Sequence, residues 1–193
     1  MYKWNTKYIV EDNFLTNEDF ESCVKYYDVI KDTDGFTVDK FTRQQWQISK
    51  NKFFTNGKLS IQTDLATRIY NKYNSLMIKY LEDLAPEKLK LYEFSEVNFI
   101  RNGANNNFHI HYDSPGKLLS VVVYLYPKNN FGTFFYSNEN GDDCYELEWK
   151  QNRALIFSRN DKTWHSYKSD SKGDRYTLVY NLRSCKNDKE RMM

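Results

Sequence analysis

The sequence predicts a mainly β fold with N-terminal helices, in which the β part forms an antiparallel sandwich or jelly roll. Before about residue 92, helical signals alternate with irregular stretches, and after it strand signals dominate. The intervals between the strand-like runs are too short for helical crossovers, which argues against a doubly wound parallel sheet. Short, evenly spaced strands with polar turns are typical of sandwiches and jelly rolls. The predicted strands are Glu96–Arg101, Phe108–Tyr112, Leu118–Tyr126, Thr133–Tyr136, Tyr145–Trp149, Arg153–Phe157, Thr163–Tyr167 and Tyr176–Leu182.

Two helices are predicted in the N-terminal half. Thr16 followed three residues later by Asp19 resembles a capping box. Apolar and aromatic side chains then recur at helical spacing at Phe20, Val24 and Tyr27. A second stripe steps by three or four residues through Leu65, Ile69, Tyr73, Leu76 and Tyr80. Ala85-Pro86 should end this second helix, and Gln45 to Ile48 is a candidate short strand between the two.

The length of 193 residues fits one domain. We divide it into a helical and irregular support region (1–91), a jelly-roll core (92–183) and a polar tail (184–193). The 28 basic and 26 acidic residues form no long single-sign run, so no nucleic-acid partner is expected. Three cysteines without a CxxC pattern indicate neither a disulfide framework nor a zinc site. No apolar signal region or membrane-length apolar stretch occurs, so we expect a cytoplasmic protein without membrane contact.

The three histidines of the chain belong to one candidate metal site or lie beside it. His111 and Asp113 are two residues apart, so in an extended strand both point to the same side. His165 would then come from a neighbouring strand. Two imidazoles and one carboxylate on one face are typical of non-haem Fe(II). A rival set of His109, His111 and His165 would resemble a zinc site, with Asp113 hydrogen-bonded behind it.

Around these residues the chain resembles the 2-oxoglutarate- and Fe(II)-dependent oxygenases, and within them the prolyl 4-hydroxylase-like branch. The resemblance covers roughly Glu96 to Arg183 and depends on the order and spacing of several short stretches. They are Phe108 to Asp113, Leu118 to Leu125, Arg153 to Phe157, Thr163 to His165 and Gly173 to Thr177. The resemblance implies a double-stranded β-helix (jelly-roll) core around an iron site.

The resemblance also implies a role for each matching residue. His111, Asp113 and His165 would be the iron ligands. Arg175 would pair with the distal carboxylate of 2-oxoglutarate, because a planar guanidinium binds a carboxylate with two hydrogen bonds. Residues expected to complete this co-substrate site are Tyr124 and Thr177. Candidates for lining the pocket or contacting substrate are His109, Arg101, Tyr126 and Trp164, with a surface arginine as the alternative reading of Arg101.

Three positions depart from the family pattern. Arg101 stands roughly where a tyrosine near the proximal carboxylate of 2-oxoglutarate is common, on the strand before the iron motif. A pair of glycines is common in the strand after Tyr124, but Phe131-Gly132-Thr133 supplies one. A glycine is also common in the turn before Arg153, where this chain has Gln151-Asn152. Asparagine tolerates left-handed backbone angles, so we expect the turn to be conserved in shape.

The function implied is a hydroxylase that uses O2 and 2-oxoglutarate as co-substrates, with ascorbate as a supporting reductant. A prolyl residue in a peptide or protein is the expected substrate. A small-molecule hydroxylase of the same superfamily and a cupin-like metal enzyme that does not use 2-oxoglutarate are the alternatives.

Overall fold

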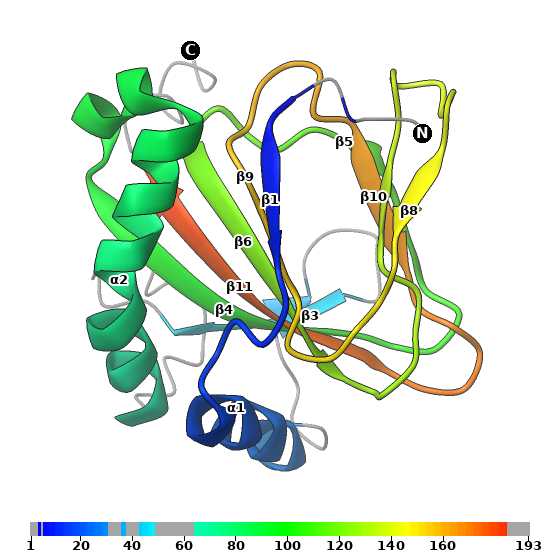
Figure 1. The fold of residues 1–193 in the computed structure, drawn as a ribbon. Coiled ribbons are helices and arrows are strands. Elements are labelled where there is room, and N and C mark those ends of the chain that lie inside the picture. Colours follow the sequence, from blue (N-terminus) through cyan, green and yellow to red (C-terminus); the bar gives the residue numbers. More distant parts are fainter. Residues whose placement is uncertain (1–3, 5, 31–35, 38–42, 49–63, 185–193) are drawn as a thin grey trace.

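The computed structural model describes residues 4, 6–30, 36–37, 43–48 and 64–184 (Figure 1). Two antiparallel sheets contain all the strands of this part of the chain. The larger has seven strands in the order β1-β9-β6-β11-β4-β3-β2, and the smaller has four in the order β5-β10-β7-β8. Figure 1 shows the helix α2 on one face of the large sheet and the small sheet on the other. This is the predicted double-stranded β-helix.

The strand bounds follow the sequence prediction closely. All eight predicted strands are present, as β4 (Phe94–Asn102), β5 (Asn107–His111), β6 (Lys117–Tyr126), β7 (Thr133–Phe135), β8 (Tyr145–Leu147), β9 (Ala154–Phe157), β10 (His165–Lys168) and β11 (Arg175–Arg183). The candidate strand around Gln45 is β3 (Arg43–Ile48), which pairs with β4 and with β2 (Phe36–Thr37). An unpredicted strand, β1 (Tyr8–Glu11), pairs with β9 at the opposite edge.

Both predicted helices are confirmed, as α1 (Asn17–Ile30) and α2 (Asp64–Leu84). A short 3-10 helix, η2 (Pro86–Leu91), begins at the proline that ends α2. Within the described residues, no helix is both long and apolar enough to cross a membrane.

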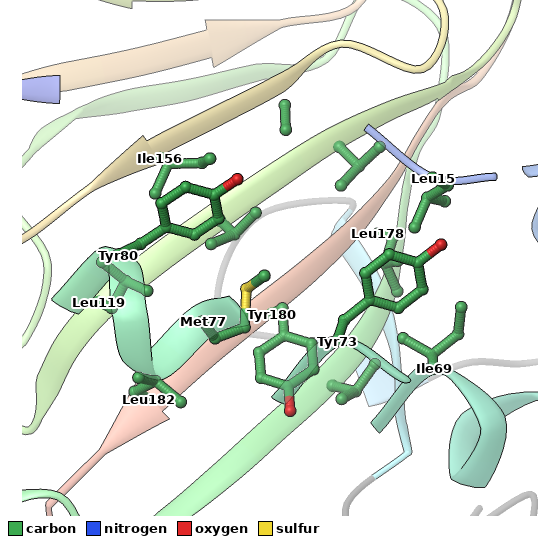
Figure 2. Packing of buried hydrophobic residues seen from close by; sticks show 14 of the residues in the cluster. Leu15, Ile69, Tyr73, Met77, Tyr80, Leu119, Ile156, Leu178, Tyr180 and Leu182 are labelled. Atoms are coloured by element: carbon green, nitrogen blue, oxygen red, sulfur yellow. The ribbon is translucent and has the colours of Figure 1, made fainter. Parts of the chain in front are cut away.

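The main core lies between α2 and the large sheet (Figure 2). Strand alternation sends every second side chain of β11 toward the helices, so Leu178, Tyr180 and Leu182 are buried there. They pack with Met77 of α2 and the other members of the cluster, including Ile69, Tyr73, Tyr80, Leu119 and Ile156. The intervening residues of β11 therefore face the small sheet, where the cavity described below is formed.

The capping motif at the start of α1 also ties the two helices together. Thr16 Oγ1 donates to Asp19 Oδ2 over 2.7 Å. The fully buried Asp19 also accepts hydrogen bonds from Lys72 at 2.6 Å and Tyr73 at 2.8 Å, both on α2. Arg68 adds an ion pair at 2.9 Å. One carboxylate thus fixes the start of α1 against α2.

Asn152 occupies the turn where the family often has glycine. Its φ of 59° is in the left-handed region. Its side chain also makes two hydrogen bonds to the backbone of Leu15, with Oδ1 accepting from the amide N–H and Nδ2 donating to the carbonyl, both at 2.9 Å. The asparagine therefore satisfies the turn and anchors the N-terminal segment, which a glycine would not do.

Replacing Asn152 should separate these two roles. Asn152→Gly keeps the turn but loses both hydrogen bonds, which should lower the free energy of unfolding by about 1–3 kcal/mol. Asn152→Ala loses the same hydrogen bonds and keeps a β-carbon at positive φ without the polar side chain that tolerates this conformation, so it should lower the free energy of unfolding by about 1 kcal/mol more than the glycine variant. Urea denaturation measures both variants. Equal losses would show that the backbone angle contributes nothing.

Candidate metal centre

The structure brings together the three predicted ligands. His111 ends β5, Asp113 follows it two residues later, and His165 begins β10. β5 and β10 pair antiparallel with His165 opposite His111, so that the two rings are 4.3 Å apart between centroids. One ligand atom from each of the three residues lies within 4.8 Å of the others. Within the described part of the chain, this is the group that meets the geometry of a metal site.

The rival three-histidine site does not form. The side chain of His109 is exposed, and its ring stacks on Phe108 with a centroid distance of 4.7 Å. The His109 carbonyl accepts a hydrogen bond from His111 Nδ1 at 2.9 Å. His109 therefore positions a ligand through its backbone and lies outside the cavity that the triad lines.

Both ligand histidines are held with the same ring nitrogen toward the cavity. His165 Nδ1 lies 2.8 Å from the carbonyl of Thr163, in the same arrangement as His111 with its own carbonyl partner. Because a carbonyl oxygen only accepts, Nδ1 must carry the proton in each ring. The lone pair then lies on Nε2, which is the tautomer that a metal-binding histidine needs.

Asp113 is buried and has two hydrogen-bond donors. Ser120 Oγ donates to Oδ2 at 2.7 Å, and Lys117 Nζ donates to Oδ1 at 2.6 Å. Burial by itself would raise the pKa of Asp113, but the Lys117 ammonium and the two histidines outweigh it and hold the pKa well below its ordinary value. The carboxylate is therefore ionised, as a metal ligand must be.

The two imidazoles are uncharged for the opposite reason. Burial, followed by the neighbouring His165, lowers the pKa of His111 to about 3. Burial also lowers the pKa of His165, whose ring is enclosed by Phe157 at 5.2 Å and Trp4 at 5.9 Å between centroids. Two neutral imidazoles and one carboxylate, each oriented by a second group, fit a divalent ion such as Fe(II).

The predicted co-substrate arginine lines the same cavity as the triad. Arg175 begins β11 and is only 2% exposed. Its guanidinium lies 4.7 Å from the Tyr167 ring centroid and 5.2 Å from that of Trp149, and Nε donates to the Phe131 carbonyl at 3.4 Å. These contacts hold a buried cation in the cavity that the three predicted ligands also line. Thr177, also predicted for this site, lines the cavity as well.

Tyr124 lies behind the cavity wall. Its fully buried hydroxyl donates to Thr133 Oγ1 at 2.9 Å and accepts from the Thr133 N–H at 3.0 Å. Thr133, in contrast, lines the cavity. Tyr124 is therefore placed to orient a threonine hydroxyl beside Arg175. Gly132 makes this possible, because a β-carbon there would lie 1.7 Å from the Leu147 carbonyl oxygen on β8.

The remaining predicted pocket residues lie outside the cavity. Arg101 is next to the cavity-lining Ile100, so alternation sends it to the other face, where Nε is 3.6 Å from Asp174 Oδ2. Trp164 packs edge-on against Tyr112 at 4.7 Å between centroids. Tyr126 pairs with Tyr176 across a register shift in β6 and β11, which turns its ring to the helical side against Tyr27.

Sequence reasoning missed four polar side chains of the cavity, which are Lys117, Ser120, Thr133 and Tyr167. Ser120 shares a strand face with Val122, and this period of two could have identified it. Lys117 and Thr133 lie at strand starts, where polar residues are ordinary. No local pattern distinguishes them from surface positions.

Because the two histidines are neutral in the folded protein, the free energy of unfolding should depend on pH. The unfolded chain takes up protons on His111 and His165 below a pH of about 6.5, and the folded chain does not. Stability of the metal-free protein should therefore fall as the pH drops from 7.5 to 5.5, by up to about 1.4 kcal/mol per pH unit for each histidine. Urea unfolding with a chelator measures it. His111→Gln should make the slope shallower, because one of the two neutral histidines is gone. An unchanged slope in this variant would contradict the prediction.

Comparisons with known proteins agree with the site. Residues 97–183 match the family model of the 2OG-Fe(II) oxygenase superfamily. A comparison with curated proteins found no match.

Among solved structures, a Trichoplax adhaerens prolyl hydroxylase in complex with a hypoxia inducible factor peptide aligns with a TM-score of 0.70 and 15% identity, over 97% of this chain and 87% of that one. A Pseudomonas putida prolyl-4-hydroxylase aligns with a TM-score of 0.65 and 12% identity, over 93% of this chain and 94% of that one. A collagen prolyl hydroxylase of Paramecium bursaria Chlorella virus 1 in its 2-oxoglutarate complex aligns with a TM-score of 0.57 and 13% identity, over 94% of this chain and 98% of that one. At such identities these likenesses establish the fold. The family match over residues 97–183, the triad and the arginine cavity show that this part of the chain is similar to the 2OG-Fe(II) oxygenase superfamily, in which Fe(II) is the cofactor and 2-oxoglutarate the co-substrate.

Proposed function

We propose that the protein hydroxylates a prolyl residue in a peptide or protein substrate. The oxygenase chemistry beneath this proposal is carried by one observation, which is that a metal triad and a buried arginine line the same cavity. The match of residues 97–183 to the 2OG-Fe(II) oxygenase family model favours this use of 2-oxoglutarate over the cupin-like alternative.

Arg175 is the group that would hold the distal carboxylate of 2-oxoglutarate. Its guanidinium is fixed by surrounding rings, so little conformational entropy is lost when it forms two hydrogen bonds with a carboxylate. The hydroxyls of Thr133 and Thr177 line the same end of the cavity and can donate further hydrogen bonds. The arginine thereby sets the direction in which the co-substrate lies.

Apolar side chains line much of the same cavity, namely Ile100, Val122, Leu155, Phe157 and Val179. They suit the methylene carbons of a dicarboxylic acid and exclude water from the reacting end. His111, Asp113 and His165 would hold Fe(II), which when bound supplies the activation of O2 coupled to oxidative decarboxylation of the co-substrate. The protein itself orients the reactants, supplies charged groups and excludes water from the cavity.

The prolyl substrate is supported by the comparisons. Three of the similar structures are described as prolyl hydroxylases, and one of them holds a peptide. In this chain, aromatic rings lie beside the triad, where Phe108 meets the His111 ring edge-on at 4.8 Å and stacks on Tyr167 at 4.9 Å between centroids.

The proposal is tested in two steps. Anaerobic addition of Fe(II) and 2-oxoglutarate should produce the weak visible charge-transfer band of the chelated co-substrate. Admitting O2 with a library of proline-containing peptides should then give succinate and a peptide that has gained one oxygen atom on proline. Modification at another residue, or of free small molecules alone, would refute the prolyl assignment while leaving the oxygenase class in place.

The anchoring role of Arg175 predicts a selective defect. Arg175→Ala should raise the 2-oxoglutarate concentration required for half-maximal band formation by about 10–100-fold, corresponding to the loss of charged hydrogen bonds. Its affinity for Mn(II) should stay near the wild-type value. Arg153→Ala is a matched control, because that arginine pairs with Asp12 away from the cavity. Equal losses of metal and co-substrate affinity in Arg175→Ala would argue against anchoring.

A further inference from the structure

One charged residue of the cavity, Lys117, has no role in the proposed reaction, although it contacts the predicted ligand Asp113. Lys117 lines the cavity, and its Nζ lies 2.6 Å from Asp113 Oδ1. The lysine side chain is 22% exposed, whereas that of Asp113 is 6% exposed. The ammonium is therefore the charge that balances a buried carboxylate in the metal-free protein.

The two donors to Asp113 differ in what a metal ion would do to them. Ser120 is neutral and buried, so its hydrogen bond to Oδ2 is compatible with a cation on the carboxylate and helps to orient it. Lys117 is itself a cation on Oδ1. A dication bound by the triad would lie within a few ångströms of this ammonium, and like charges repel strongly where water is excluded.

The lysine is also able to leave. Its stem has four rotatable carbons, and its side chain is partly exposed to solvent. Asp113, in contrast, is fixed by Ser120 and by the Arg159 Nε hydrogen bond to its backbone carbonyl at 3.0 Å. The carboxylate thus stays in place whichever cation it holds.

We propose that Lys117 is an internal competitor of the metal ion: its ammonium occupies the Asp113 carboxylate in the metal-free site and must be displaced when the metal binds. The competition sets the metal affinity, and it also keeps the empty triad assembled by neutralising its one negative charge. This inference depends on the proposed metal site, and the experiment separates the two.

The experiment is a Mn(II) titration of the metal-free protein, followed by the electron paramagnetic resonance signal of the free ion. Lys117→Met should bind Mn(II) at least about 10-fold more tightly than the wild type, because the competing charge is gone. Lys117→Arg keeps the charge and should stay near the wild-type value. Ser120→Ala should change in the opposite direction, with about 10–100-fold weaker binding.

Lys150→Met is the control for the loss of a lysine as such. Lys150 makes a 2.7 Å ion pair with Asp12, which resembles the Lys117 contact but lies outside the cavity. It should leave Mn(II) affinity unchanged. A second readout is the metal-induced rise in melting temperature, which should be larger in Lys117→Met than in the wild type, since the metal-free form loses its counter-charge.

Unchanged or weaker Mn(II) binding in Lys117→Met overturns the proposal, provided that Asp113→Ala abolishes binding. If Asp113→Ala still binds Mn(II), the proposed metal site itself is contradicted, and not only the competition by Lys117. If Lys117→Met is unfolded without metal, recovery of its circular dichroism spectrum on addition of Mn(II) supports the proposal, and failure to recover contradicts it.

Discussion

The backbone ladder between β5 and β10 is the constraint on which the candidate site depends. It places His165 opposite His111 and so brings residues more than fifty positions apart into one metal site. A slip of one residue would turn one imidazole to the other face of the small sheet. The ladder itself is held by β7 on the other side of β10, and by the packing of Trp4 and Phe157 over the His165 ring.

Charge is the second constraint. A buried carboxylate without a partner would be strongly unfavourable, so the metal-free cavity can exist only because donors surround Asp113. Burial favours the neutral form of both ligand types, which suits the imidazoles but would leave the carboxyl group protonated. The Lys117 ammonium counteracts this effect at Asp113. The triad is therefore ready for a dication without any loss of protons.

Much of this could be predicted from the sequence, for reasons that are physical. The eight core strands and the two helices have strong periodicity, because each buries one face. The candidate ligands were identified because the chain has only three histidines, and two of them fit a His-x-Asp pair on a strand followed by a later histidine. Arg101, Tyr126 and Trp164 were placed in the pocket on their approximate positions along the chain. Strand parity sends Arg101 to the other face, a register shift does the same for Tyr126, and Trp164 packs against Tyr112.

What could not be predicted depends on contacts that leave no local pattern. β1 is short and exposed at its edge, so its pairing with β9 is a tertiary event. Tyr124 was expected to contact the co-substrate, yet its hydroxyl bonds to Thr133 of β7, which lies between it and the cavity. Lys117 is only four residues from Asp113, but a lysine at the start of a strand is ordinary, so its spacing alone did not single out the ion pair.

The alternation of side chains along β11 has a consequence for how such a protein can change. Odd-numbered residues from Arg175 to Val179 line the reactive cavity, and even-numbered residues from Tyr176 to Leu182 form the core against the helices. The strand therefore separates the residues that shape the cavity from the residues that stabilise the fold. A substitution on the cavity face can therefore change how the co-substrate is held, while the packing that stabilises the fold stays unchanged on the other face.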